Sequence, residues 1–166
     1  MKLTQEQAER MRGHARTAYP DECCGVIVGP PSGASGEGNG DPRGLRVFLL
    51  RNIQGEMHEK DPQSYPRTAR RAFLIEPFEL ERILREARSK GEVLRGIFHS
   101  HPDEDAYFSQ EDKEAAVPFG DVPSFPDAAH IVLSVREGEV RGAKVFRWDR
   151  ARKDFLAEEL EVAEGA

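Results

Sequence analysis

Residues 93–112 read VLRGIFHSHPDEDAYFSQED, and this stretch decides both the fold and the chemistry that the sequence predicts. Its apolar first part predicts a strand over Val93–His99, which runs directly into HSHP. Its last part predicts a helix over Ser109–Ala116. Because alternate residues of a strand point to the same face, the side chains of His99 and His101 are expected to lie together.

His99, His101 and Asp112 are the candidate metal ligands of this stretch. Two neutral imidazoles at this spacing can bind one cation, and a helix that folds back over the strand end can bring Asp112 to them. Two histidines, one carboxylate and one water form an open tetrahedral site of the catalytic kind, whereas a structural zinc site is normally closed, usually by sulfur. A helix-capping role for Ser109 and Asp112 is the alternative, and it is compatible with metal binding because a cap holds the aspartate in place.

Predicted helices and strands are interspersed along the rest of the sequence, and the sequence contains no internal repeat. This order favours an α/β (α+β) fold with a single mixed β-sheet flanked by helices, and 166 residues suit one domain over residues 1–166. A stretch rich in glycine and proline at about 30–44 predicts a flexible loop between two antiparallel strands. We expect helices between Thr4 and Pro20 and between Pro77 and Gly91, strands over 24–29, 45–51 and 72–75, and a hairpin of 129–135 with 139–148, whereas 54–71 and 155–162 remain unassigned.

Charge and apolar patterning exclude several classes of protein. Thirty acidic against 24 basic residues give a net charge of −6, which argues against a broad basic face for nucleic acid. The apolar runs are only a few residues long, so we expect no membrane span, and the N-terminus lacks the apolar core of a secretory signal. Cys23 and Cys24 are adjacent and cannot close a disulfide-bonded loop, which indicates a reducing, cytoplasmic location. Either they pack as small apolar residues of a strand or one of them is a reactive thiol.

The spacing from His99-Ser100-His101 through seven residues to Ser109, and through two more to Asp112, resembles the signature of the JAMM (MPN-plus, JAB-domain) metalloproteases. The upstream segment YPDECCGVIVG resembles the part of that family that carries a catalytic glutamate. The segments FLIEPFELERIL and HIVLSV extend the resemblance, which covers most of the chain from Leu3 to Trp148.

The resemblance implies a JAB/MPN-like (cytidine-deaminase-like) architecture and a catalytic site. Position by position, it makes His99, His101 and Asp112 the ligands of one zinc ion that carries a bound water. It makes Glu22 the general base for that water and Ser109 a hydrogen-bond donor to the developing oxyanion. The residues alone do not single out Glu22 among the twenty glutamates of the chain.

For function, the resemblance to the prokaryotic members implies a zinc-dependent peptidase or isopeptidase. Its substrate and partner would be a ubiquitin-like or sulfur-carrier protein, cleaved at the amide bond after the C-terminal Gly-Gly. Phe108 departs from the family, since many members have proline at this position, and this bears on the shape of the substrate groove. The sequence leaves open whether the chain forms a homodimer.

Other functions fit the sequence less well. A non-catalytic MPN-type scaffold or interaction domain is the main alternative, and the intact candidate ligands argue against it. A barrel amidohydrolase that begins with His-x-His needs about 250 residues, more than this chain has. The metallo-β-lactamase pattern fails because Pro102-Asp103-Glu104 follows His101. A DNA-repair relative with a similar metal motif is disfavoured by the acidic charge.

Overall fold

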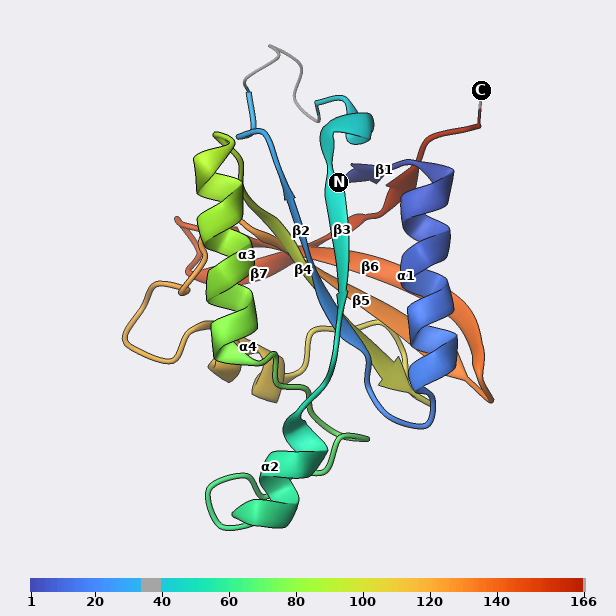
Figure 1. Ribbon diagram of the computed structural model, residues 1–166, viewed down its shortest axis with the longest axis vertical. Helices are drawn as coiled ribbons and strands as arrows, with labels where there is room; N and C mark the ends of the chain where they lie inside the picture. The colour runs from blue at the N-terminus through green and yellow to red at the C-terminus, as the bar shows by residue number, and fades with distance from the viewer. Residues whose placement is uncertain (34–39, 166) are drawn as a thin grey trace.

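A six-stranded mixed sheet lies at the centre of the computed structural model, which describes residues 1–33 and 40–165 (Figure 1). The strand order is β3-β2-β4-β5-β6-β7, in which β4 and β5 are parallel and every other pair is antiparallel. The elements are β1 (Lys2–Leu3), α1 (Gln5–Ala18), β2 (Cys24–Gly29), a 3-10 turn (Pro42–Gly44), β3 (Arg46–Leu50), α2 (Gln54–Lys60), α3 (Pro77–Ser89), β4 (Val93–Pro102), α4 (Gln110–Ala116), β5 (Ala129–Arg136), β6 (Glu139–Asp149), β7 (Asp154–Glu159) and β8 (Glu161–Val162).

Helices cover both faces of this sheet, as Figure 1 shows for α1 and α3. The alternation along β2 explains the two layers: Ile27 packs in the cluster that contains Met11 of α1, whereas Val26 and Val28 pack with Ile83 of α3. Helix α4 lies on the α3 side, where its Ala116 packs against the cluster that contains Val132 of β5. The expected mixed sheet flanked by helices is therefore confirmed.

Gly25 of β2 allows the central strands to approach each other. The ring of Phe98 on β4 and the carbonyl of Phe48 on β3 occupy the space into which a Cβ atom at position 25 would project. Phe98 is fully buried there, between the sheet and α1. This packing holds β4 against β2 just before the two histidines.

The two ends of the described chain meet on the α1 side of the sheet. Strands β1 and β8 pair in parallel, and the carbonyl of Met1 accepts a hydrogen bond of 2.9 Å from the backbone N–H of Glu161. Met1 and Leu3 are buried in the same cluster as Met11 of α1. In residues 1–33 and 40–165, no helix combines the length and the apolar character that crossing a membrane requires.

The expected helices and the hairpin of β5 and β6 are present, but three segments differ from expectation or extend it. The unassigned polar segment contains α2, a seven-residue helix without a side-chain cap. The strand expected over 72–75 is wrong, because only Ile75 forms a bridge, to Asn52. The undecided C-terminal segment forms β7 and β8. Residues 34–39 of the flexible loop predicted at about 30–44 lie outside the described residues, and Pro42–Gly44 of the same stretch form the 3-10 turn.

Candidate metal centre and catalytic cleft

The end of β4 brings the two histidines together on the α3 side of the sheet. His99 lies opposite Cys24 of β2 in the antiparallel ladder, and His101 follows two positions later on the same face. Their Nε2 atoms are 3.1 Å apart, and both side chains are buried. The expectation that the two imidazoles share one face is confirmed.

Asp112 completes a three-atom cluster from the first turn of α4. Its Oδ2 atom is 3.2 Å from the Nε2 atoms of both His99 and His101. The same residue forms a capping box, because Ser109 donates its backbone N–H to Oδ2 at 3.0 Å and accepts the backbone N–H of Asp112 on Oγ at 3.0 Å. The capping role of Asp112 is therefore compatible with its position beside the two imidazoles, as the sequence predicts.

The segment between β4 and α4, together with Phe73 from the segment before α3, holds these groups in place. The Nδ1–H of His101 donates to the carbonyl of Asp105 at 3.1 Å, so Nε2 carries the free lone pair. The ring of Phe73 stacks on His99 at 4.5 Å between ring centres. Phe108, which replaces the proline of many family members, stacks on Phe146 at 5.4 Å. Its side chain therefore anchors the segment that leads into Ser109.

The cluster has the donor set and the spacing of a cation site. Three atoms that accept hydrogen bonds or bind metals converge, and all lie within 4.8 Å of one another. Ligand atoms at 2.0–2.1 Å from a tetrahedral zinc ion are about 3.3–3.4 Å apart, close to the separations found here. Burial lowers the pKa of His99, which favours the neutral imidazole that a metal requires. Burial alone would raise the pKa of Asp112, but its contacts with the imidazoles of His101 and His99 hold that pKa well below its usual range.

Glu22 reaches the same site from the residue pair that precedes β2. Its backbone N–H donates to the carbonyl of Ala69 at 2.8 Å, and its carbonyl accepts from Nδ2 of Asn52 at 3.0 Å. The side chain is 6% exposed, and its Oε2 atom has no hydrogen-bond partner among the residues that the structure describes. Burial, together with repulsion from Asp112 and Glu104, raises the pKa of Glu22 to about 9.

A cleft of about 140 Å³ unites these groups. Glu22, His101, Ser109 and Asp112 line it, whereas His99 is fully buried. The structure thus brings together all five residues that the sequence analysis selected. The three arginines of the segment RTARR, residues 67–71, also line the cleft, and sequence reasoning missed them. Their density in an otherwise unassigned polar segment was the available signal.

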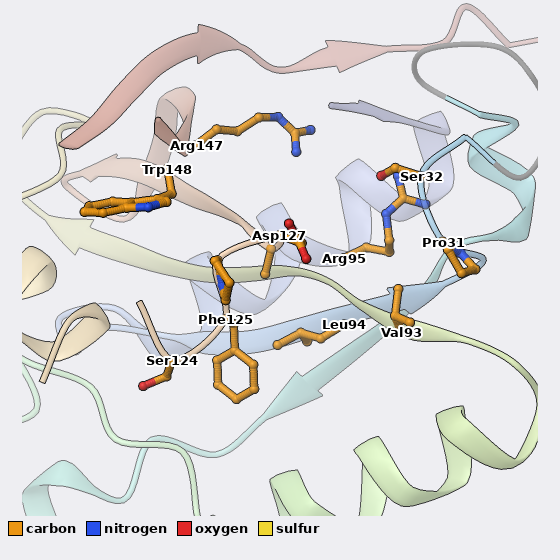
Figure 2. Close-up of a pocket in the computed structure, with 12 residues that line it drawn as sticks. Pro31, Ser32, Val93, Leu94, Arg95, Ser124, Phe125, Asp127, Arg147 and Trp148 are labelled. Carbon is orange, nitrogen blue, oxygen red and sulfur yellow. The ribbon is translucent and has the colours of Figure 1, made fainter. Parts of the chain in front are cut away.

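A larger cavity of about 650 Å³ lies elsewhere, at the first residues of β4 (Figure 2). Val93 and Arg95 line it together with Trp148 at the end of β6. None of the five selected residues lines this cavity. The chemistry expected from the sequence is therefore located at the other end of β4, in the smaller cleft.

The adjacent cysteines belong to the packing of the sheet. Both thiols are free and buried. Burial raises the pKa of Cys23 to about 11 and also raises that of Cys24. A thiolate is therefore disfavoured at both positions, which supports the packing interpretation over the reactive thiol.

Comparison with known proteins places these features among relatives. A family model described as prokaryotic homologues of the JAB domain matches residues 4–150. The chain is also similar to proteins named CysO-cysteine peptidase in Mycobacterium tuberculosis and Mycobacterium bovis. The identity is 30% over 137 residues, which are 82% of this chain and 75% of each relative.

Solved structures show the same fold. A protein of Desulfitobacterium hafniense has a TM-score of 0.67 and 26% identity, covering 99% of this chain and 93% of that one. A protein of Salinibacter ruber has a TM-score of 0.59 and 25% identity over 99% and 92% of the two chains. A JAB1/MPN-domain protein of Archaeoglobus fulgidus, at 19% identity, has a TM-score of 0.50 over 99% and 100%. The expected JAB/MPN-like architecture is confirmed.

Proposed function

The chain belongs to the family of prokaryotic homologues of the JAB domain, and from this premise we propose that it is a zinc-dependent peptidase. The similarity to a protein named as a peptidase supports a peptidase-like function. One observation carries the finer proposal: His99 Nε2, His101 Nε2 and Asp112 Oδ2 converge within 3.2 Å of one another, beside the buried carboxyl of Glu22.

In this proposal His99, His101 and Asp112 hold the zinc ion. The donor set fits, because two neutral imidazoles and a carboxylate are ordinary zinc ligands and leave one position open. When bound there, zinc lowers the pKa of a water molecule and polarises a carbonyl group. The Asp105 carbonyl keeps His101 in the tautomer that presents Nε2 to the ion.

Glu22 transfers the proton. Its carboxyl group takes one proton from the attacking water while the carbon–oxygen bond forms, and it gives that proton to the leaving nitrogen as the carbon–nitrogen bond breaks. Burial raises the pKa of Glu22 to about 9 in the metal-free protein, and a cation in the cleft lowers it by favouring the carboxylate.

Ser109 stabilises the charge that develops on the carbonyl oxygen. Its Oγ atom already accepts the backbone N–H of Asp112, which leaves the hydroxyl hydrogen free to point into the cleft. A donor held in this way needs little reorganisation when the negative charge appears. The cap of α4 thereby positions a catalytic hydroxyl.

We assign the substrate to the class of ubiquitin-like or sulfur-carrier proteins, cut after their C-terminal Gly-Gly. Two observations support this class: the similarity to the CysO-cysteine peptidases, and a cleft whose volume of about 140 Å³ suits a thin glycine tail. The alternative, a non-catalytic scaffold, does not explain why three metal-binding atoms converge beside Glu22.

The test uses the zinc-loaded protein and a set of small sulfur-carrier proteins extended by one residue beyond Gly-Gly. Intact-mass measurement should show carriers shortened by that residue, and a chelator should prevent the loss. Metal analysis of the same preparation should give one zinc ion per chain. Bound zinc with no shortened carrier would contradict the substrate class, and a chain that binds no zinc would favour the scaffold.

A further inference from the structure

The turn of residues 67–71, which we call the arginine turn, forms one side of the catalytic cleft. It contributes Arg67, Arg70 and Arg71 to the lining. The acidic side chain of Glu104 enters from the segment between β4 and α4, and that of Glu111 from the first turn of α4. The basic and acidic groups around the catalytic residues therefore come from different segments.

The arginine turn is bonded directly to the catalytic machinery. The carbonyl of Ala69 accepts the backbone N–H of Glu22 at 2.8 Å. The carbonyl of Arg67 accepts from Nε2 of Gln54, a buried side chain, also at 2.8 Å. Within the turn, the N–H of Arg71 donates to the carbonyl of Thr68 at 3.0 Å. The positions of these arginines are thus set relative to Glu22.

Two of the three guanidinium groups are available to a ligand. Arg70 is paired with Asp103 at 3.2 Å, and Asp103 also accepts the hydroxyl of Tyr19. Within residues 1–33 and 40–165, Arg67 and Arg71 form neither an ion pair nor a side-chain hydrogen bond, although both line the cleft. A guanidinium is well suited to bind a carboxylate with two parallel hydrogen bonds.

The geometry of the reaction places a carboxylate close to these arginines. The leaving nitrogen must lie at Glu22, which returns the proton. When the leaving group is a C-terminal residue, its carboxyl carbon is about 2.5 Å from that nitrogen. When the leaving group is a lysine side chain, the carboxyl of that residue is separated from the nitrogen by the four-carbon stem. Only the first leaving group puts a negative charge next to the base.

We propose that Arg67 and Arg71 bind the free α-carboxylate of the residue that is removed and so give the protein a preference for a free C-terminus over a blocked one. The inference rests on the proposed peptidase function and adds two residues that determine its specificity.

The experiment compares two peptides that end in Gly-Gly-Ala, one with a free carboxylate and one with a carboxamide. We expect kcat/KM of the zinc-loaded protein to be about 10-fold or more higher for the free acid, since a hydrogen bond to a charged group is lost in the amide. In Arg67→Ala and Arg71→Ala this ratio should fall toward one. Arg82→Ala, which removes an exposed arginine of α3 outside the cleft, should keep the ratio of the unaltered protein.

A binding measurement separates this inference from the proposed function. Fluorescence anisotropy with zinc-loaded Glu22→Gln reports binding of both labelled peptides without turnover. Tighter binding of the acid by about 10-fold, lost when Arg67 and Arg71 are both replaced by alanine, supports the inference even if no peptide is hydrolysed. Equal binding of acid and amide, or an unchanged preference in that double variant, overturns it even if hydrolysis is rapid.

Discussion

The buried carboxyl group of Glu22 and the half-buried one of Asp112 have opposite tendencies to ionise. Asp112 contacts two imidazoles and accepts the N–H of Ser109, and its pKa lies well below its usual range. Glu22 has an oxygen without a partner among the described residues, and its pKa is raised to about 9. Environments that separate two carboxyl groups in this way typically assign them different roles. Here Asp112 suits a permanent ligand, and Glu22 suits a group that gains and loses a proton.

Substitution at these residues should separate metal binding from catalysis. Glu22→Gln preserves the three convergent atoms, so zinc should remain at one ion per chain while hydrolysis falls by about 10²–10⁴-fold. His101→Ala removes a ligand and should lose both zinc and hydrolysis. Metal analysis and turnover measured on the same samples check the pair. Near-full turnover of Glu22→Gln would show that another group is the base.

The raised pKa of Glu22 also makes the stability of the metal-free protein depend on pH. The folded state keeps this proton up to about pH 9, whereas the unfolded chain releases it near the ordinary value of 4.5. The contribution to the free energy of unfolding is complete below the lower value and is lost as pH rises to the higher one. Between about pH 5 and about pH 9, the Tm of metal-free Glu22→Gln should therefore fall less than that of the unaltered protein. Parallel losses of Tm would contradict the raised pKa.

At the scale of elements, the site residues that lie on one continuous segment could be predicted from the sequence. The site residues that strand pairing brings to the same place could not. The histidines, Ser109 and Asp112 follow from a strand and a capped helix that are neighbours in sequence. Glu22 depends on how the start of β2 lies against the end of β4, so only the family resemblance selected it. The arginine turn lacks an apolar period because it lines the cleft rather than the core, and α2 lacks one because Gln54 is its only buried residue. The pairing of β1 with β8 joins two-residue strands that local patterns cannot reveal.

The segment between β4 and α4 should depend on its aromatic anchor. Phe108 is buried among Phe146, Phe155 and His130, so Phe108→Ala should lower the free energy of unfolding by about 3–5 kcal/mol. It should also weaken zinc binding, since the anchor precedes Ser109. Phe119→Ala removes a ring that is 88% exposed and should change stability by less than about 0.5 kcal/mol. Urea unfolding of both variants measures the difference, and equal stabilities would argue against the anchor.

The close packing of β2 against β4 at Gly25 should also contribute to the stability of the fold. Gly25→Ala forces a methyl group against the Phe98 ring and the Phe48 carbonyl, and the strands must shift. We expect a loss of about 1–3 kcal/mol in urea unfolding. Gly142→Ala on β6 is the matched control, because nothing lies within 4 Å of its added carbon. If both variants were equally stable, the close packing at Gly25 would not matter.

For the whole molecule, the cleft is assembled from segments far apart in sequence. Residues before β2, the arginine turn, the end of β4 and the start of α4 all contribute to it. The site therefore exists only in the folded state. A ligand that binds there must stabilise the entire fold, since an unfolded chain cannot gather the same groups.

Zinc should accordingly raise the thermal stability of the protein. A free concentration of about one hundred times Kd adds about 2.7 kcal/mol, which corresponds to a rise in Tm of about 5–10 °C for a chain of this length. A chelator should reverse the rise. Mg²⁺ should have little effect, because it prefers oxygen ligands to imidazole. Scanning calorimetry with each ion compares the two effects on Tm. A Tm that does not change when zinc is added would argue against the metal centre.

The junction of β1 with β8 has a practical consequence. Met1 packs on the α1 side of the sheet, whereas α4, which contributes Asp112 to the cleft, packs on the opposite face. An affinity tag or a surface tether attached beyond the exposed Gly165 would therefore lie away from the cleft, whereas one attached at the N-terminus would displace the buried Met1. Protein immobilised beyond Gly165 should leave the cleft accessible, so candidate substrates can be screened on a chip.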